Sequence, residues 1–288
     1  MSIFKAAAIQ MRSGTDPERN AIDLEAMVRD AASQGATYIQ TPEMTGAIVR
    51  DQEARRSLFT SEDRDVIVAA SARLAAELGV YLHIGSTAIL RADGKLANRA
   101  LLFGPDGAVV ATYDKIHMFD VDLDNGESWR ESAAYEAGRE AVVAELPMAR
   151  FGLAVCYDLR FPQLFRAEAL AGADVLTVPA AFTRQTGEAH WHVLLRARAI
   201  ENGAFVIAAA QGGLHEDGRE TFGHSLIIDP WGRVLAEASH DRPAVIVAEI
   251  DVNQSAAARK KIPNLKNARE FAVSRVGPAD AALRGAAS

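Results

Sequence analysis

Apolar residues recur along this chain in two alternating patterns, one typical of amphipathic helices and one of buried strands. Residues 5–11 form a short apolar run rich in alanine, which predicts a strand. Residues 17–34 follow the helical pattern, with apolar positions three or four residues apart: Ala21, Leu24, Met27, Val28 and Ala31. Gly35 stands where a left-handed residue commonly ends a helix. The chain therefore begins with a strand followed by a helix.

The same alternation continues to residue 261. It predicts further strands over 36–41, 80–86, 99–103, 109–114, 141–146, 151–156, 174–179, 204–210, 224–229, 234–238 and 244–250, and helices over 61–78, 162–171, 187–202 and 253–261. Ser61 and Asn253 are the expected N-caps of their helices, and residues 104–107 form a turn between two strands. Strands alternating with helices indicate an α/β fold with mixed sheets, and the almost continuously apolar strands near 153, 175 and 205 indicate cover on both faces.

Composition narrows the class of protein. The 288 residues are 49% hydrophobic and 24% charged, which is globular composition, and no linker or repeat divides them. We expect one domain over 1–270 and a C-terminal tail over 271–288. The net charge of −7 and the absence of a basic run argue against nucleic-acid binding. The apolar runs are far shorter than the ~20 residues of a membrane helix, and no signal peptide is recognised, so a cytoplasmic location is expected.

The single cysteine, Cys156, is the first candidate for chemistry. One cysteine excludes an intramolecular disulfide and a cysteine-rich zinc site. Cys156 follows an apolar strand and precedes a helix, a position where α/β proteins place functional residues and where backbone N–H groups can hold an oxyanion. A buried structural cysteine is the alternative interpretation.

Three charged residues could support a nucleophilic thiol. Glu43 closes a strand after a proline, where burial would raise its pKa toward the working pH of a general base. Lys115 ends another strand and could stabilise an oxyanion, and Glu131 could orient Lys115 or contact a leaving ammonia. Each also has an ordinary interpretation as a solvated surface charge.

Considered together, these residues form a recognisable set. The runs that contain them occur in a fixed order: Gln40-Thr-Pro-Glu43, Tyr113-Asp-Lys115-Ile-His-Met-Phe-Asp-Val-Asp122, Ser128-Trp-Arg-Glu131-Ser132 and Cys156-Tyr-Asp-Leu-Arg-Phe-Pro162. The chain resembles the nitrilase superfamily of carbon–nitrogen hydrolases over nearly its whole length. The resemblance is closest to the Nit branch, which contains deaminated glutathione amidase and omega-amidase, and Ala208-Ala-Ala-Gln211 and Asp229-Pro-Trp-Gly232 resemble the former. Residues 123–126 (Leu-Asp-Asn-Gly) depart from the Pro-Gly pair of the relatives.

The resemblance implies a four-layer α-β-β-α sandwich and an amidase that needs no metal or organic cofactor. Cys156 would attack the amide carbonyl, with Glu43 as general base and Lys115 and the Tyr157 N–H holding the oxyanion. Glu131 would support Lys115, and ammonia would leave. Such proteins commonly form homodimers, so a homodimer or a higher homo-oligomer is expected, with the helix over 162–171 and the C-terminal segment as candidate contacts. A small-molecule amide is the only other expected partner, with no nucleic acid and no membrane.

Substrates of this branch carry a carboxylate, for which Arg160 is the candidate clamp. An ion pair with Asp158 is its alternative role. Phe182 and Thr186 are candidates for the pocket wall, although core packing and helix capping would also explain them. His190 and His192 lie two positions apart and point to different helix faces, so we expect no metal there.

Several functional alternatives remain at this stage. The substrate could be deaminated glutathione, a keto-acid ω-amide such as α-ketoglutaramate or α-ketosuccinamate, or an N-carbamoyl amino acid. A thiol protease with His117 or His224 as its base is a different mechanism. A catalytically silent dimeric scaffold is a different class of protein.

Overall fold

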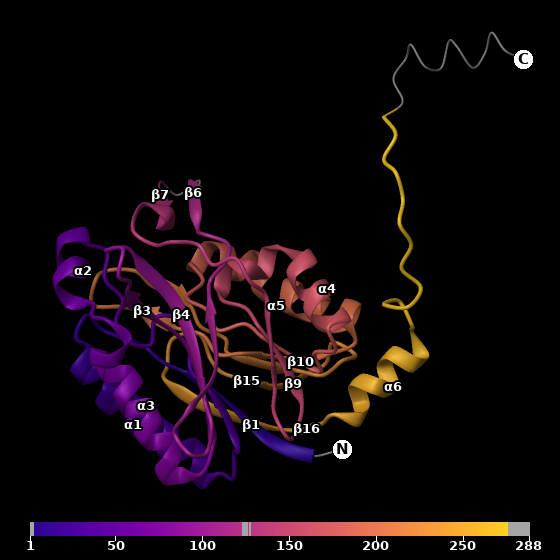
Figure 1. Cartoon of the computed structure of the whole chain (residues 1–288), viewed down its shortest axis with the longest axis horizontal. Helices are drawn as coiled ribbons and strands as arrows, with labels where there is room; N and C mark the ends of the chain where they lie inside the picture. Colours follow the sequence, from indigo (N-terminus) through magenta and orange to yellow (C-terminus); the bar gives the residue numbers. More distant parts are fainter. Residues whose placement is uncertain (1–2, 123–125, 127, 276–288) are drawn as a thin grey trace, which may run out of the picture.

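Two six-stranded sheets pack face to face, with helices on both outer sides (Figure 1). The computed structural model describes residues 3–122, 126 and 128–275. The arrangement is the expected four-layer α-β-β-α sandwich in a single domain. No helix in the described ranges combines the length and the apolar character that a membrane span requires. The domain boundary expected at residue 270 stays a prediction.

The first sheet has the strand order β16-β1-β2-β3-β4-β5. These strands are β1 (Ile3–Gln10), β2 (Tyr38–Gln40), β3 (Tyr81–Leu90), β4 (Leu96–Phe103), β5 (Val109–Asp114) and β16 (Ala244–Asp251). The three strands β1 to β3 run parallel, and the outer pairings are antiparallel. Helices α1 (Pro17–Ser33) and α3 (Val66–Leu78) cover its outer face, where Leu24, Val28 and Leu74 are fully buried.

The second sheet has the strand order β15-β14-β11-β10-β9-β8. These strands are β8 (Val142–Glu145), β9 (Arg150–Leu153), β10 (Val175–Thr177), β11 (Phe205–Ala208), β14 (Leu226–Ile228) and β15 (Val234–Glu237). Strands β9 to β11 run parallel, and all their residues except Arg150 are buried, as their apolar sequences predict. Helices α4 (Pro162–Leu170) and α5 (Arg184–Asn202) cover its outer face.

The sheets meet through a shared core. The ring of Tyr38 in the first sheet stacks on Phe151 in the second, with centroids 4.4 Å apart. Phe4 adds a tilted contact to the same ring at 6.0 Å. This packing fixes the two sheets against each other, and with them the strand ends from which both halves of a site could project.

Several short elements lie outside the sheets. They are α2 (Gln52–Leu58), α6 (Asn253–Lys261), the hairpins β6 (Asp120–Asp122) with β7 (Ser128–Arg130) and β12 (Gly212–Leu214) with β13 (Glu220–Phe222), and the 3₁₀ turns η1 (Glu62–Arg64), η2 (Glu131–Ala133) and η3 (Cys156–Arg160). The β6–β7 hairpin projects from the body in Figure 1. Residues 123–125, most of the departure from the Nit-branch pattern, lie outside the described residues, and Gly126 has a φ of +87°.

The helix expected over 61–78 begins later than predicted. Residues 62–64 form η1, and α3 starts after Asp65, whose side chain accepts hydrogen bonds from the N–H groups of Ile67 and Val68. The Ser61 side chain makes no capping hydrogen bond. Asn253 is likewise the first helical residue of α6, with Val252 at the cap position. For α3, the carboxylate of Asp65, two residues before the buried Ile67, is therefore a stronger signal of the helix start than Ser61.

Other boundaries shift at strand ends. Strand β3 extends four residues beyond its predicted end, and β4 begins at Leu96 because the two pair over a long antiparallel register. The strand expected over 151–156 ends at Leu153, and Cys156 begins η3. Helix α5 starts at Arg184 with Thr183 as its N-cap residue, so the capping role considered for Thr186 is wrong.

Candidate active site

Strand ends from both sheets bring the predicted residues together. Glu43 follows β2 and Lys115 follows β5 in the first sheet, while Cys156 lies just past β9 in the second. All three belong to the lining of one cavity, together with Glu131 from η2. Glu43 and Cys156, the first and last of the four, are 113 positions apart in the sequence, so only the face-to-face packing of the sheets brings them together.

Lys115 is held between two carboxylates. Its Nζ lies 3.0 Å from Oε1 of Glu43 and 2.8 Å from Oε2 of Glu131. The lysine is 2% exposed and Glu43 is 5% exposed, so neither is the surface charge that single-residue statistics favour. A buried ammonium persists here because two carboxylates are in direct contact with it.

Asn98 completes this network and was not predicted. Its Nδ2 donates to Oε1 of Glu43 and to Oε1 of Glu131, both at 2.9 Å. The N–H of Ala181 donates to the other Glu43 oxygen at 2.9 Å. A buried asparagine in a strand is the signal that could have found it, but the predicted strand began at residue 99 and left Asn98 in a loop.

Cys156 adopts a strained backbone conformation. Its φ is +52°, in the left-handed region that non-glycine residues seldom occupy, and its N–H donates to the carbonyl of Pro179 at 2.9 Å. Met44, next to Glu43, is similarly strained at +55°. Strain of this kind persists where the surrounding structure fixes a side chain in a particular direction. Here Cys156 is 7% exposed, and its thiol and the Glu43 carboxylate lie close enough to shift each other's pKa.

The charges of the cluster are mutually dependent. Burial raises the pKa of Glu43, but the Lys115 charge and hydrogen bonds from Cys156, Lys115 and Asn98 outweigh it and hold the pKa below 4.5. The expectation that burial would raise this pKa toward neutrality is therefore wrong. Burial also acts to lower the pKa of Lys115, yet Glu131 and Glu43 together raise it well above 10.5.

The thiol itself is protonated at rest. Burial and the neighbouring Glu43 charge raise the pKa of Cys156 well above 9.0, although Lys115 acts in the opposite direction. A neutral thiol beside an ionised carboxylate is poised to lose its proton only when bond formation at sulfur drives the transfer.

The cavity in front of the thiol has a volume of about 710 Å³ and a cationic wall. Its lining contains two carboxylates, Glu43 and Glu131, and six cations: Arg50, Arg55, Lys115, Arg130, Arg160 and Arg219. Lys115 is engaged by the two carboxylates and Arg130 pairs with Asp122, so the other four arginines leave the remainder of the cavity positive. Such a cavity suits an anionic ligand.

Arg219 is the most distinctive of these arginines, and no sequence pattern predicted it. Its guanidinium lies over the Trp129 ring, 4.3 Å from the centroid, and its buried Nε has no hydrogen-bond partner among the described residues. Burial lowers its pKa although the charges of Asp217 and Glu43 oppose it, and the like charge of Arg55 acts in the same direction as burial. A guanidinium in this state gains most from a carboxylate ligand.

The predicted substrate-binding residues all line the cavity. Arg160 lies over the rings of Tyr157 and Phe182 and contacts Nδ1 of His190 at 3.2 Å. The ion pair with Asp158 considered for Arg160 is absent from the described contacts. Asp158 instead accepts from the Tyr113 hydroxyl at 2.7 Å and from the backbone N–H of Val155 at 2.8 Å.

Phe182 has both roles considered for it, whereas Thr186 lines the cavity without capping the helix. Phe182 is 6% exposed and packs on Trp191 with centroids 4.9 Å apart, so it is both core residue and cavity wall. The Thr186 hydroxyl is 2.9 Å from that of Thr183.

Neither histidine proposed as an alternative base belongs to the cavity lining. His117 pairs with Asp158, Nδ1 to Oδ1 at 2.6 Å, and stacks on Phe161. His224 lies with His192 and Glu237, a group outside the cavity lining whose side chains could hold a metal ion. The thiol therefore has a carboxylate as its neighbouring base.

The two-sheet α/β sandwich brings a thiol, a carboxylate and an ammonium into one cavity. These are the groups that a thiol-dependent acyl-transfer hydrolase uses for catalysis. The sequence model of the carbon-nitrogen hydrolase family matches residues 5–260, and the chain belongs to that family. The protein is an amidase.

The chain is similar to proteins named deaminated glutathione amidase. It is 37% identical to that of Yersinia enterocolitica, covering 93% of this chain and 94% of the relative, and 40% identical to that of Homo sapiens, covering 91% and 81%. Among solved structures it resembles the NitFhit protein of C. elegans, with a TM-score of 0.87 and 33% identity. That match covers 93% of this chain and 66% of NitFhit.

Proposed function

We propose that this amidase hydrolyses deaminated glutathione or a closely related amide with a carboxylate on each side of the scissile bond. The curated relatives carry that name at 37–40% identity over nearly the whole chain. The observation that carries the proposal is the cavity itself, in which a Cys–Glu–Lys cluster lies beside a wall of arginines.

In the first half of the proposed reaction, Sγ of Cys156 attacks the amide carbonyl and its proton passes to Glu43. The carbonyl oxygen becomes an oxyanion next to Lys115 Nζ and the Tyr157 N–H. Collapse of this intermediate breaks the C–N bond, and the departing amine takes the proton from Glu43. The products are a thioester on Cys156 and a free amine.

In the second half, a water molecule attacks the thioester and gives a proton to Glu43. The C–S bond breaks, the proton returns to the sulfur, and the carboxylic acid leaves. Glu131 and Asn98 act as positioning residues in this scheme, because both contact the Lys115–Glu43 pair. A preorganised oxyanion donor contributes about 3–4 kcal/mol to such a barrier reduction.

The leaving group depends on the substrate. Deaminated glutathione has no primary amide, so its hydrolysis releases the dipeptide cysteinylglycine rather than the ammonia expected from the sequence. A keto-acid ω-amide releases ammonia. The product thus separates the two substrate classes.

The arginines support recognition of two carboxylates. Arg219 and Arg55 both line the cavity, and burial lowers the pKa of Arg219, with the like charge of Arg55 acting in the same direction. A carboxylate bound between them would offset both effects. Arg160 stands near the nucleophile at the end of η3. We assign the two ends of the substrate to these two positions.

A catalytic thiol also favours a reducing compartment, because oxidation would block it. This supports the cytoplasm as the place of action.

The deciding experiment compares kcat/KM for deaminated glutathione, α-ketoglutaramate and an N-carbamoyl amino acid, with cysteinylglycine and ammonia measured separately. We expect deaminated glutathione to give the highest value. A higher value for either of the others would reject the substrate while leaving the amidase mechanism intact.

The proposed base is tested by Glu43→Gln. Loss of a general base lowers rates by about 10²- to 10⁴-fold, so both turnover and acylation of Cys156 should fall in that range. Glu136→Gln is the matched control, because Glu136 is a partly exposed carboxylate that pairs with Lys95 and does not line the cavity. If Cys156 in Glu43→Gln were acylated as fast as in the wild type, the assignment of Glu43 as the general base would be rejected.

A further inference from the structure

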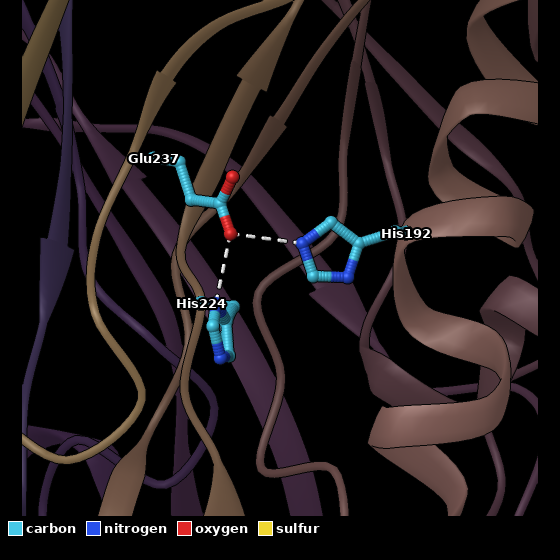
Figure 2. A group of neighbouring side chains, drawn as sticks. All are labelled: His192, His224 and Glu237. Carbon is cyan, nitrogen blue, oxygen red and sulfur yellow. Dashed lines mark hydrogen bonds and ion pairs between the residues drawn. The ribbon is translucent and has the colours of Figure 1, made fainter.

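Figure 2 shows two imidazoles and one carboxylate close together, and none of the three residues lines the cavity. His192 comes from helix α5, His224 from the segment before β14, and Glu237 from the end of β15. Oε1 of Glu237 lies 2.9 Å from Nε2 of His192 and 2.8 Å from Nδ1 of His224. All three candidate ligand atoms lie within 4.8 Å of one another.

The backbone holds His224 in this place under strain. Its φ is +52°, and its carbonyl accepts a hydrogen bond of 2.8 Å from Nε1 of the fully buried Trp191. Its ring stacks on Phe222, with centroids 4.5 Å apart. Strained non-glycine residues persist where surrounding contacts determine them. The direction of this imidazole is therefore set before any ligand binds.

The donor set selects the chemical class of the ligand. Two imidazole nitrogens with one carboxylate oxygen suit Zn²⁺ and similar borderline metals, whereas Mg²⁺ and Ca²⁺ prefer oxygen alone. Zinc bonds of about 2.0–2.2 Å in a tetrahedron separate neighbouring ligands by about 3.3 Å. Glu237 Oε1 lies 2.8 and 2.9 Å from the two imidazole nitrogens, slightly closer than this separation, and no two ligand atoms are more than 4.8 Å apart. Small side-chain rotations would therefore bring the three atoms to the distances that zinc requires.

We propose that His192, His224 and Glu237 bind a divalent transition metal, best matched by Zn²⁺, with water completing the coordination. Each imidazole frees its ligating nitrogen by carrying its proton on the other ring nitrogen. The partly buried histidines and the exposed glutamate leave an open side for the ion to enter.

The site would have a structural role. It joins helix α5 to the β14–β15 hairpin, and none of its three residues belongs to the cavity lining. A metal bound there stabilises the folded chain by linkage, because the unfolded chain does not hold the three ligands together. The sequence could not predict this site, because His190 and His192 point to different faces of the helix. The two residues that join His192, namely His224 and Glu237, come from other elements of the fold.

The experiment is a calorimetric Zn²⁺ titration of the chelator-treated protein, repeated with His192→Ala and Glu237→Gln. We expect one ion per chain with a dissociation constant of about 10 μM or tighter, and affinity at least about tenfold weaker in each variant. Saturating Zn²⁺ should raise Tm by a few degrees in the wild type only. His190→Ala is the matched control, because it removes a neighbouring imidazole from the same helix and should bind as the wild type does.

Cys156 is the main competing ligand, so Cys156→Ser is titrated as well. Retained binding in Cys156→Ser supports the site. Binding that disappears in Cys156→Ser but persists in His192→Ala would overturn it, as would an absence of binding in the wild type. In the last case the three residues form only a hydrogen-bonded cluster. Amide turnover and circular dichroism of His192→Ala and Glu237→Gln verify that these variants are folded.

Discussion

At the residue scale, the site depends on how one ammonium is shared. Lys115 contacts both Glu43 and Glu131, and its charge keeps the pKa of Glu43 low despite burial. Burial and the Glu43 charge raise the pKa of the neighbouring thiol. Neither shift follows from residue type, because burial alone would push a carboxyl the other way. The sequence predicted the members of the cluster, and their contacts determine their charges.

These charges predict a broad pH profile. The pKa of Glu43 lies below 4.5, so the carboxylate is lost only as the pH falls through that lower value. The pKa of Lys115 lies well above 10.5, so the ammonium is retained up to alkaline pH. We expect kcat/KM to be flat from about pH 6 to about pH 9. A limb near pH 6.5 would instead indicate a histidine base.

Arg219 should govern affinity for anionic substrates. Hydrogen bonds to charged groups contribute about 1.5–3 kcal/mol, so Arg219→Gln should raise KM for deaminated glutathione about 10- to 100-fold with a smaller change in kcat. Arg219→Lys keeps the charge without the planar fork and should recover part of the loss. The control is a neutral amide such as propionamide, for which KM should not change. An equal effect on both substrates would indicate a structural role.

At the scale of the elements, long periodic segments matched their predictions and short polar ones did not. Helix α1 and strand β5 appear where the apolar pattern placed them. Helix α2 was not predicted because its sequence, Gln-Glu-Ala-Arg-Arg-Ser-Leu, has no apolar stripe. The β6–β7 hairpin was not predicted because its three-residue strands are too short to show an alternating pattern. Asn98 was missed for a related reason, since strand pairing rather than local pattern extends β4.

The start of α3 supplies a test at this scale. Asp65 caps two N–H groups, while Ser61 caps none through its side chain. Asp65→Ala should lower the free energy of unfolding by about 1 kcal/mol, since a lost cap typically has that effect. Ser61→Ala is the matched control and should change it by much less. Urea unfolding measures both, and equal effects would contradict the assignment of the cap.

At the scale of the whole molecule, several large apolar side chains are exposed on the outer surface of the part of the chain that the structure describes. Leu170 at the end of α4 is 61% exposed and Val193 on α5 is 68% exposed. Residues 266–275 are exposed and run away from the body in Figure 1, with Phe271 86% exposed. We propose that these surfaces join two copies of the chain, as the resemblance implied.

Sedimentation tests the dimer. The wild type should sediment at twice the 30.9 kDa chain mass at micromolar concentration. Val193→Glu places a charge on the exposed face of α5 and should shift the equilibrium toward monomer. Ile22→Glu is the control, because Ile22 is 62% exposed on α1 at the opposite outer face. A wild type that sediments only as monomer would reject the proposal.

The sequence by itself determined the alternation of strands and helices, because the periods of apolar positions are local properties of the chain. It also supplied the chemistry of Glu43, Lys115 and Cys156, since side-chain identity needs no fold. Only the tertiary structure decided which polar groups meet: Asn98 with two carboxylates, Arg219 against Trp129, and His192 with His224 and Glu237. Their contacts join residues far apart in sequence, so sheet packing creates them and local pattern cannot encode them.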